Sequence, residues 1–271
     1  MKQVVLITGA SSGIGKESAR LLIDKGYTVY AAARRIEKMS DLQALGVKLI
    51  ELDITIDASI QQAVSTIISA EQRIDVLVNN AGYGSYGSLE DVPLEEARYQ
   101  FEVNIFGLAH LTQLVLPHMR KQGSGKIINI SSMGGKFGEP HGAWYHATKF
   151  ALEGLSDSLR MELRQFGIDV VVIQPGAIKT EWNKIARENL MKVSGNTAYK
   201  TLAEKHARFL EKGDGSMGSD PAVIAKTISK AITSSKPKTR YVAGAGARPL
   251  LFLKNILPDR MFDKLLLGLM R

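Results

Sequence analysis

The chain has 271 residues and contains no cysteine. Disulfide bonds and thiolate catalysis are therefore excluded, and we expect a cytoplasmic protein, because a chain without disulfides suits a reducing compartment. No apolar run approaches the roughly 18 residues that a membrane-spanning helix needs, so no segment is expected to cross a bilayer. The opening stretch "KQVVLITGA" is too short for a signal peptide and has no cleavage pattern, so it predicts a first strand.

Acidic residues are the scarcer charged class, with 27 Asp and Glu against 35 Lys and Arg, which gives a net charge of +8. Such a surface is either merely solvated or attracts an anionic ligand such as a phosphorylated cofactor. The basic residues are scattered and no recognition module is visible. We therefore expect no nucleic-acid partner.

Short β-favouring runs alternate with longer helical patterns along the chain. The strand candidates are nearly all apolar, which predicts a Rossmann-type α/β fold, a doubly wound parallel sheet of about seven strands. The expected strands are residues 4–8, 28–32, 48–52, 76–79, 126–131, 169–174 and 240–243. The expected helices are residues 14–25, 58–70, 94–121, 144–165 and 222–232. Without a linker or repeat, and with 45% hydrophobic residues, the whole of 1–271 is expected to be a single domain.

Two segments lie outside this alternation. Residues 181–220 are a polar, mainly helical insertion after a strand, which we interpret as a substrate cover, a decorative surface helix pair being the alternative. Residues 248–271 form an apolar, basic C-terminal tail with Pro258 in its middle, and they predict two short amphipathic helices. The tail could pack on the cover or a partner subunit, or make peripheral contact with an anionic membrane.

The first strand is followed by the glycine-rich stretch "TGASSGIG". Glycines let the backbone turn tightly and approach a pyrophosphate, whose charge then lies at a helix N-terminus. In the first β-to-α turn of a parallel sheet, this pattern indicates a dinucleotide site. The predicted cofactor-binding residues of the turn are Gly9, Ser11, Ser12, Gly13, Ile14 and Gly15.

The second strand ends in Arg34 and Arg35, where a carboxylate would bind the hydroxyls of an adenosine ribose. A guanidinium matches the geometry and charge of a phosphate, so the pair favours NADP(H) over NAD. The alternative is that both are simply exposed arginines that open a helix. After the third strand, Asp53 and Ile54 are expected to meet the adenine amino group and the adenine ring.

The motifs together resemble the short-chain dehydrogenase/reductase family, most of all its hydroxysteroid and retinol dehydrogenase branch. The resemblance covers residues 3–180 in order and spacing. Its motifs are "TGASSGIG" (8–15), "NNAG" (79–82), "VN" (103–104), "ISS" (130–132), "YHATK" (145–149) and "PG" (175–176).

The resemblance implies a catalytic set. Tyr145 would exchange a proton with the substrate oxygen, and Lys149, one helical turn on, would favour the phenolate and hold the nicotinamide ribose. Ser132 would hydrogen-bond the substrate oxygen; the family spacing and the strand alternation select it over Ser131. Asn104 would hold a water that relays protons through the lysine.

The remaining cofactor contacts also follow from the resemblance. Tyr145 and Lys149 would border the nicotinamide side, and the ends of the fourth and sixth strands would complete the site. These further cofactor-binding residues are Asn80, Ala81, Gly82, Pro175, Gly176, Ile178 and Thr180.

The residues around Tyr145 need separate interpretation. His141 and His146 have no triad partner and no metal-ligand spacing, so they are expected to be surface or pocket-lining side chains, with no metal site. Trp144 is a neighbour that could shape the pocket. Glu139 lies near the expected pocket mouth and has no assigned role.

The sequence thus predicts an NADP(H)-dependent oxidoreductase that interconverts a ketone or aldehyde with an alcohol, acting on a small, lipophilic substrate. Within the enzyme class, a 3-oxoacyl-type reductase is the alternative. Outside it, a non-catalytic NADP-binding regulator on the same fold is the rival. The resemblance also implies a homodimer or homotetramer that pairs through the helices at 94–121 and 144–165.

Overall fold

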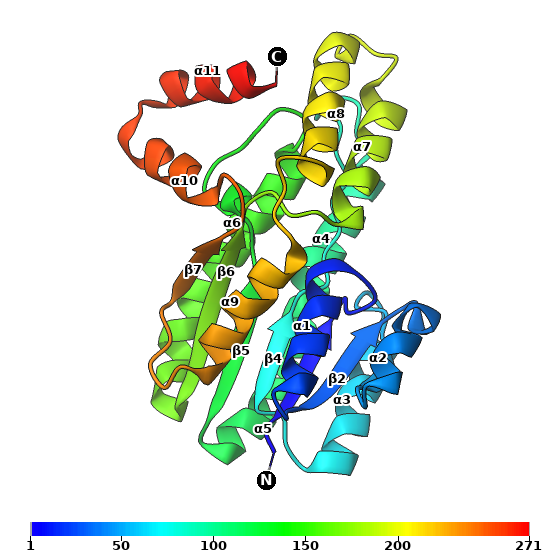
Figure 1. Cartoon of the computed structure of the whole chain (residues 1–271), viewed down its shortest axis with the longest axis vertical. Coiled ribbons are helices and arrows are strands. Elements are labelled where there is room, and N and C mark those ends of the chain that lie inside the picture. The colour runs from blue at the N-terminus through cyan, green and yellow to red at the C-terminus, as the bar shows by residue number, and fades with distance from the viewer. Residues whose placement is uncertain (1, 271) are drawn as a thin grey trace.

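The computed structural model, described here for residues 2–270, contains one seven-stranded sheet in the order β3-β2-β1-β4-β5-β6-β7 (Figure 1). Every neighbouring pair is parallel. The strands are β1 Val4–Thr8, β2 Thr28–Ala33, β3 Lys48–Glu51, β4 Val76–Asn79, β5 Gly125–Ile130, β6 Ile168–Pro175 and β7 Arg240–Ala243. All seven expected strands are confirmed, and the chain is a single α/β Rossmann-like domain.

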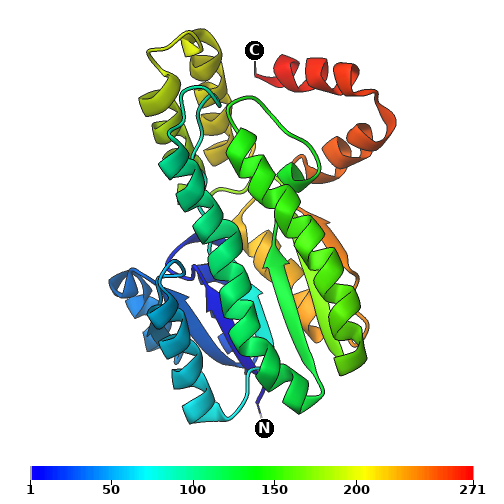
Figure 2. The ribbon, with the colours of Figure 1, turned by 180° about the vertical axis from the view of Figure 1, so that it is seen from behind.

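Helices cover both faces of the sheet, as the apolar strands require (Figures 1 and 2). On β1, Val5 and Ile7 pack toward α1 and α9, whereas Val4 and Leu6 pack toward α3 and α5. The helices are α1 Gly13–Asp24, α2 Ser40–Ala44, α3 Asp57–Glu71, α4 Leu94–Phe101, α5 Gly107–Gln122, α6 Ala143–Leu163, α7 Glu181–Ser194, α8 Lys200–Asp214, α9 Pro221–Thr233, α10 Ala247–Ile256 and α11 Asp259–Leu269.

Two details differ from the expected helices. A 3₁₀ turn, Ile36–Met39, and the short α2 follow β2, where no helix was expected. The helix expected over 94–121 is α4 and α5 joined by a π-helical turn, Glu102–Phe106. Periodicity cannot reveal such a turn, because a single π turn barely alters the apolar pattern, yet π turns are frequent at functional sites.

The insertion at 181–220 contains α7 and α8, which stand beyond the carboxyl edge of the sheet (Figure 1). The loop after β4 anchors this pair: Ser194 Oγ donates to Asp91 Oδ2 at 2.7 Å, and Thr197 Oγ1 donates to the same oxygen at 2.8 Å. The insertion is therefore fixed to the body of the protein at its far end, while α7 begins at the cleft.

The C-terminal tail forms the two expected helices, α10 and α11. Phe262 and Leu266 are buried against Phe137, whose ring lies 5.2 Å from that of Phe262. The tail therefore packs on the loop between β5 and α6. No helix in the described part of the chain, residues 2–270, is long and apolar enough to cross a membrane.

Candidate active site

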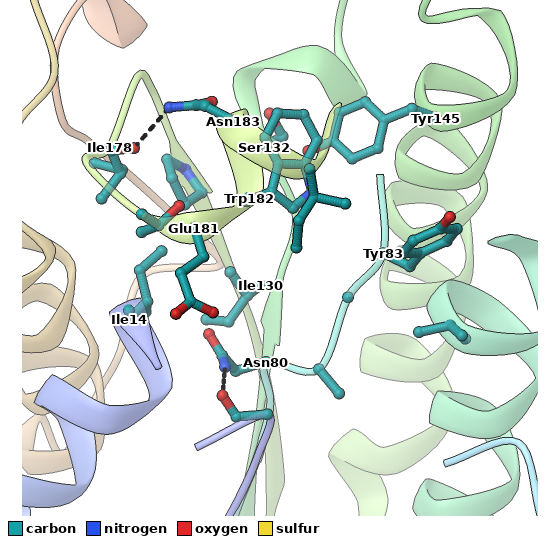
Figure 3. Close-up of a pocket in the computed structure, with 18 of the residues that line it drawn as sticks. Ile14, Asn80, Tyr83, Ile130, Ser132, Tyr145, Ile178, Glu181, Trp182 and Asn183 are labelled. Atoms are coloured by element: carbon teal, nitrogen blue, oxygen red, sulfur yellow. Dashed lines mark hydrogen bonds between the residues drawn. The ribbon is translucent and has the colours of Figure 1, made fainter. Parts of the chain in front are cut away.

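A cavity of about 480 Å³ opens at the carboxyl edge of the sheet, where β1, β2, β4, β5 and β6 end (Figure 3). Ligands of open α/β sheets bind at this edge, near the point where the strand order reverses. Nearly all of the predicted site residues line it. Those lining it are Gly9, Ser11, Ser12, Gly13, Ile14, Arg34, Arg35, Asp53, Ile54, Asn80, Ala81, Gly82, Ser132, Tyr145, Lys149, Pro175, Gly176, Ile178 and Thr180.

The glycine turn has no room for a side chain at Gly9 or Gly15. Gly9 has φ +66°, and an added Cβ would lie 2.8 Å from Ala81 Cα. Gly15 does not border the cavity; its missing side chain instead lets α1 approach the turn, since a Cβ would lie 2.5 Å from Gly9 O. Gly9 and Gly15 are therefore needed for the close packing of the turn against α1 and the end of β4.

Polar contacts hold the turn in place. The Asn80 side chain donates to Thr8 O at 2.9 Å and to Gly9 O at 3.2 Å, and Ala81 N donates to Thr8 Oγ1 at 2.9 Å. Asn80 thus supports the backbone of the glycine turn, a structural role alongside its position on the cavity wall (Figure 3).

The turn fits the diphosphate of a nicotinamide dinucleotide. Helix α1 begins at Gly13, and the side chain of its N-cap, Ser12, makes no capping hydrogen bond, so the first amides of α1 remain available to an anion. Thr180 lies over this end, with Cγ2 2.9 Å from where a Cβ on Gly13 would stand. At Gly82 an added Cβ would meet nothing nearer than 3.6 Å, so the backbone there is open to the cavity.

The two arginines after β2 have different partners. Arg34 Nη1 donates to Tyr99 Oη at 3.0 Å, and Arg35 Nη2 donates to Ser11 Oγ at 3.4 Å. Arg35 also pairs with Glu181 Oε2 at 3.3 Å. The Glu181 carboxylate, from the insertion, is therefore paired with the guanidinium of Arg35, and a phosphate bound to Arg35 would have to compete with it.

Asp53 is oriented by its own loop. Its Oδ1 accepts hydrogen bonds from Thr55 N at 2.9 Å and from Thr55 Oγ1 at 2.7 Å. Ile54 is buried beside the π turn, where its backbone oxygen would lie 2.0 Å from a Cβ on Gly107. Both residues border the cavity at the end of β3, as expected for an adenine subsite.

Tyr145 projects from the first turn of α6 into the cavity and is only 9% exposed. Burial raises the pKa of its phenol to about 12, and a hydrogen bond with Ser132 acts in the opposite direction. At neutral pH the phenol therefore keeps its proton. A protonated phenol with its oxygen toward a substrate site can act as a general acid.

Lys149 lies one helical turn after Tyr145, with Nζ 5.8 Å from the centre of the tyrosine ring. Its ammonium donates to Ile130 O at 3.0 Å, at the end of β5. Burial lowers the pKa of Lys149 to about 8, and the charge of Glu153 opposes that decrease. The pair is thus close enough for electrostatic coupling in a nearly dry site.

Ser132 follows β5 and has extended backbone geometry. Its Oγ accepts from Gly134 N at 3.0 Å and lies beside Tyr145 (Figure 3). Ser131 also borders the cavity, but its Oγ would lie 2.8 Å from a Cβ on Gly135, toward the interior of the loop. The arrangement favours Ser132 as the hydroxyl nearest to the phenol.

Asn104 lies in the π turn between α4 and α5. Its Oδ1 accepts from Tyr83 N at 2.8 Å, and its Nδ2 donates to Tyr83 O at 2.8 Å and to Thr148 Oγ1 at 3.0 Å. Gly82 lies between Asn104 and Lys149, since a Cβ there would be 3.6 Å from Asn104 Oδ1 and 4.0 Å from Lys149 Nζ. Asn104 thus ties the loop after β4 to α6.

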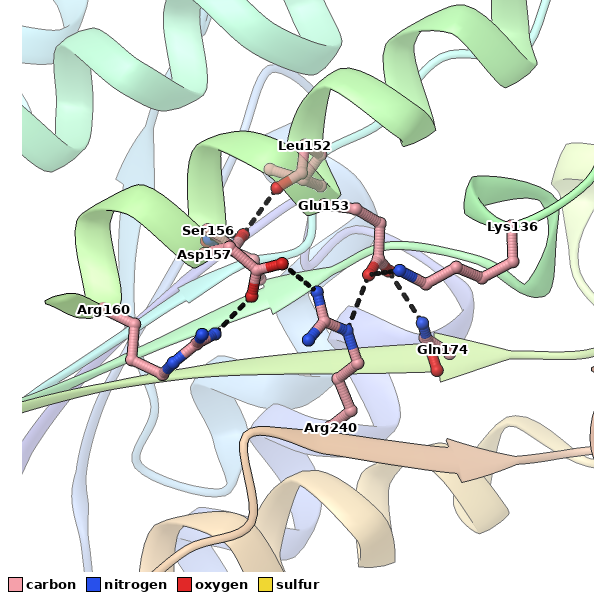
Figure 4. A network of polar contacts seen from close by, with 9 residues as sticks. Lys136, Leu152, Glu153, Ser156, Asp157, Arg160, Gln174 and Arg240 are labelled. Carbon is pink, nitrogen blue, oxygen red and sulfur yellow. Dashed lines mark hydrogen bonds and ion pairs between the residues drawn. The ribbon is translucent and has the colours of Figure 1, made fainter.

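A buried ion-pair network positions α6 (Figure 4). Glu153, one turn after Lys149, receives hydrogen bonds from Gln174 Nε2 at 2.9 Å and Arg240 Nε at 2.8 Å. Lys136 Nζ lies 2.9 Å from the same carboxylate. The network joins α6 to β6, β7 and the loop that carries Ser132, so Tyr145, Lys149 and Ser132 share one rigid support.

Several pocket residues were not predicted from the sequence. The Trp182 ring, at the start of α7, lies 4.9 Å from the Tyr145 ring and 5.6 Å from the Tyr86 ring. Gly84 makes room for it, because a Cβ there would lie 2.3 Å from Trp182 Cζ2. Only an aromatic residue at the first turn of the insertion hinted at this role.

The neighbours of Tyr145 agree with expectation only in part. His146 is buried and lines the cavity, as the pocket-lining alternative predicted, whereas His141 is buried and does not line the cavity. Trp144 does not line the cavity; its ring packs 6.4 Å from that of Phe101 on α4. The helix turns Trp144 away because adjacent helical residues point about 100° apart.

Comparison with known proteins agrees with the fold. The family described as short chain dehydrogenase matches residues 3–190. A 3-ketodihydrosphingosine reductase of Bacteroides thetaiotaomicron is 38% identical over 96% of this chain and 95% of its own length. Human retinol dehydrogenase 8 is 36% identical over 94% of this chain and 85% of its own length.

Solved structures extend the comparison. A short-chain dehydrogenase from Streptomyces avermitilis aligns with a TM-score of 0.80 at 37% identity, covering 93% of this chain and 91% of that one. Other solved structures of this fold were determined with NADP⁺ or NAD. The chain belongs to the short-chain dehydrogenase/reductase family, whose members are oxidoreductases that use NAD(P) on carbonyl and alcohol groups.

Proposed function

We propose that this protein is an NADP(H)-dependent oxidoreductase that interconverts a lipophilic ketone or aldehyde with its alcohol. The observation that carries the proposal is the buried phenol of Tyr145, with Ser132 beside it and Lys149 one turn away, facing a cavity that includes the glycine turn. Tyr145 is the acid/base, Ser132 orients the substrate oxygen, and Lys149 stabilises the phenolate.

The chemistry needs a hydride donor in addition to these side chains. When bound, the nicotinamide supplies or accepts the hydride at the substrate carbon. In reduction, the Tyr145 hydroxyl donates its proton to the carbonyl oxygen, and the resulting phenolate is stabilised by the Lys149 ammonium. The Ser132 hydroxyl donates a hydrogen bond to the same oxygen and so stabilises its developing charge. Asn104 anchors the π turn beside Lys149 and holds the proposed proton-relay water.

Tyr145→Phe tests the proposal. Removal of a positioned general acid should lower kcat for ketone reduction by about 10²- to 10⁴-fold, while the dissociation constant of NADPH stays within a few fold. Tyr30→Phe is the matched control, since Tyr30 is buried on β2 and bonds Glu71 outside the cavity. Retained turnover in the Tyr145 variant would refute the assignment.

The preference for NADP(H) rests on the two arginines at the end of β2. Arg34 and Arg35 border the cavity without a competing acidic residue on the same strand end. Replacing both by Leu should weaken NADPH binding by about 10- to 100-fold, because each charge-assisted bond to a phosphate contributes roughly 1.5–3 kcal/mol before solvent screening. NADH binding should change little. A wild-type preference for NADH would overturn this part of the proposal.

The lipophilic character of the substrate is supported by the far side of the cavity. Aromatic and aliphatic side chains from the insertion and the β5–α6 loop line it: Phe137, Trp182, Ile185, Phe209, Leu210 and Met217. The related proteins are named for ketone and retinol substrates, which fits such a lining. Within this lipophilic class, a steroid- or retinoid-like carbonyl is the first candidate and an acyl-chain ketone is the alternative. Turnover of acyl-chain ketones of graded length, compared with turnover of a steroid or retinoid carbonyl, distinguishes the two.

We further propose that the protein pairs through α4, α5 and α6. Large apolar side chains on α4, α6 and the π turn before α5 are exposed: Leu94, Phe106, Phe150 and Met161. Light scattering after size exclusion should give a dimer or tetramer, and Phe106→Glu with Phe150→Glu should yield the monomer.

The outer residues of the tail, including Phe252 and Leu269, are also exposed and are proposed to touch a membrane surface peripherally.

A further inference from the structure

Glu139 places a carboxylate on the substrate side of the cavity. It lies in the loop between β5 and α6, lines the cavity, and its side chain is only 15% exposed. Its Oε1 accepts a hydrogen bond from Tyr86 Oη at 2.8 Å. Within residues 2–270, Oε2 makes no hydrogen bond or ion pair, and it is accessible rather than enclosed.

No cationic side chain compensates this carboxylate. The groups that could carry a positive charge beside it are histidine ring nitrogens: His146 Nε2 and His206 Nε2 both lie 3.8 Å from Oε1. Among the described residues, no Lys or Arg forms an ion pair with Glu139. A mostly buried carboxylate without a counter-charge is costly to the fold, so its presence in a ligand cavity calls for a ligand that supplies the charge.

The histidines do not supply that charge. His146 Nε2 accepts from Glu139 N at 3.2 Å, and His146 Nδ1 faces Gly134 O at 2.8 Å, so only Nδ1 carries a proton and the ring is neutral. Burial lowers the pKa of His206, and burial with the neighbouring ring lowers the pKa of His141 to about 4. At neutral pH the carboxylate therefore faces neutral rings.

The position of Glu139 relative to Tyr145 limits where the ligand charge lies. The Tyr86 ring lies 5.7 Å from the Tyr145 ring, and the Tyr86 hydroxyl bonds Glu139. His146, adjacent to Tyr145 in α6, contacts the same loop. One aromatic ring thus separates the carboxylate from the proton donor, so a cation bound to Oε2 would lie within a few atoms of the reacting carbonyl.

We propose that Glu139 binds the ammonium group of the substrate, and that the enzyme acts on lipophilic amino ketones and the corresponding amino alcohols. The ammonium donates a charge-assisted hydrogen bond to Oε2, and the apolar chain extends along Trp182 and Leu210. Tyr86 holds the carboxylate in place through Oε1. This inference rests on the proposed carbonyl–alcohol activity and specifies its substrate.

The test compares two ketones of the same chain length with the full-length protein and NADPH. One is a long-chain α-amino ketone; the other lacks only the amine. Glu139→Gln removes the charge but keeps an oxygen for Tyr86, and it should lower kcat/KM for the amino ketone by about 10- to 100-fold, mostly through KM. The amine-free ketone should change by less than about threefold.

Glu96→Gln is the matched control. Glu96 also accepts a hydrogen bond from a tyrosine, Tyr83, at 2.6 Å, but it does not line the cavity. It should leave the ratio between the two ketones unchanged. An equal loss on both ketones in Glu139→Gln, or no wild-type preference for the amino ketone, would overturn the proposal and leave carbonyl reduction intact.

A binding measurement separates this proposal from the proposed function. Trp182 borders the cavity, so intrinsic fluorescence can report binding of the long-chain amino alcohol in the presence of NADP⁺. Wild type should bind it at least tenfold tighter than Glu139→Gln, and tighter than the alcohol without the amine. If neither ketone is reduced but wild type still binds the amino alcohol more tightly than Glu139→Gln does, the ammonium site is supported and the proposed carbonyl reduction is refuted. Equal binding by both proteins refutes the site.

Discussion

Replacement of Glu153 by Gln tests how the buried network supports the proposed catalytic pair, Tyr145 and Lys149. The Glu153 side chain is 4% exposed and binds Lys136, Gln174 and Arg240. Breaking a buried ion pair costs about 3–5 kcal/mol. Here Lys136 and Arg240 are both partly exposed, and Arg240 still has Asp157 as a partner in the variant. We therefore expect the unfolding free energy to fall by about 2 kcal/mol.

The same change should reach the active site. The charge of Glu153 raises the pKa of Lys149 against the stronger effect of burial, which sets it at about 8. Without that charge the pKa of Lys149 falls further. Since the proposed role of Lys149 requires its proton, the alkaline limb of kcat/KM should move to lower pH in the variant.

Urea denaturation and a pH profile of NADPH oxidation measure the two effects. Burial acts to raise the pKa of Glu153, but its hydrogen bonds with Lys136, Gln174 and Arg240 together outweigh burial and lower that pKa in the folded chain. Its contribution is therefore present above the unfolded pKa and lost as pH falls through the folded pKa, so the stability gap between wild type and variant should shrink in acid.

Asp157→Asn is the control for the network. Asp157 also binds Arg240, at 2.8 Å, but its side chain is 40% exposed, so its loss should cost less than about 1 kcal/mol and leave the alkaline limb in place. If Glu153→Gln matched wild type in urea, or if its alkaline limb did not move, the network would not support Lys149 as argued.

Three further changes test the cleft and the tail. Glu181→Gln should tighten NADPH binding roughly two- to fivefold by freeing Arg35, and an unchanged dissociation constant in fluorescence titration would contradict the competition. Gly84→Ala should displace Trp182, lower the unfolding free energy by about 1–3 kcal/mol and raise KM. A variant with the same melting temperature and KM as wild type would contradict this role of Gly84. Phe252→Ser should reduce flotation with anionic liposomes, whereas flotation equal to that of wild type would argue against membrane contact.

The fold was predictable because its signals are local. Each strand is a short apolar run, and each strand expected from the sequence is present in the sheet. The glycine turn was equally readable, since Gly9 needs a positive φ and Gly15 needs the absence of a Cβ, two requirements that only glycine meets. The short α2 was missed because five residues carry no measurable helical period.

The substrate side could not be predicted in the same way. Tyr86 and Glu139 are 53 positions apart and meet only because the loops after β4 and β5 leave adjacent strands. Trp182 reaches Tyr145 from an insertion whose path no local pattern encodes. No regular spacing in the sequence relates the residues of these loops to one another. That Tyr86, Glu139 and Trp182 gather around the cavity is therefore seen only in the folded structure.

The sign of the Tyr145 pKa shift shows how burial changes a sequence argument. Spacing predicted that Lys149 favours the phenolate, but in the folded chain burial dominates, raising the pKa of Tyr145 to about 12 and lowering that of Lys149 to about 8. Both shifts follow from one cause, because a dry site disfavours every isolated charge. The proton affinities of the two groups therefore move apart, and a phenolate forms in this site only together with the neighbouring ammonium, whose charge offsets its own. In the proposed reaction, Lys149 would therefore stabilise the phenolate as its partner in a charge pair, because burial makes an unpaired phenolate costly.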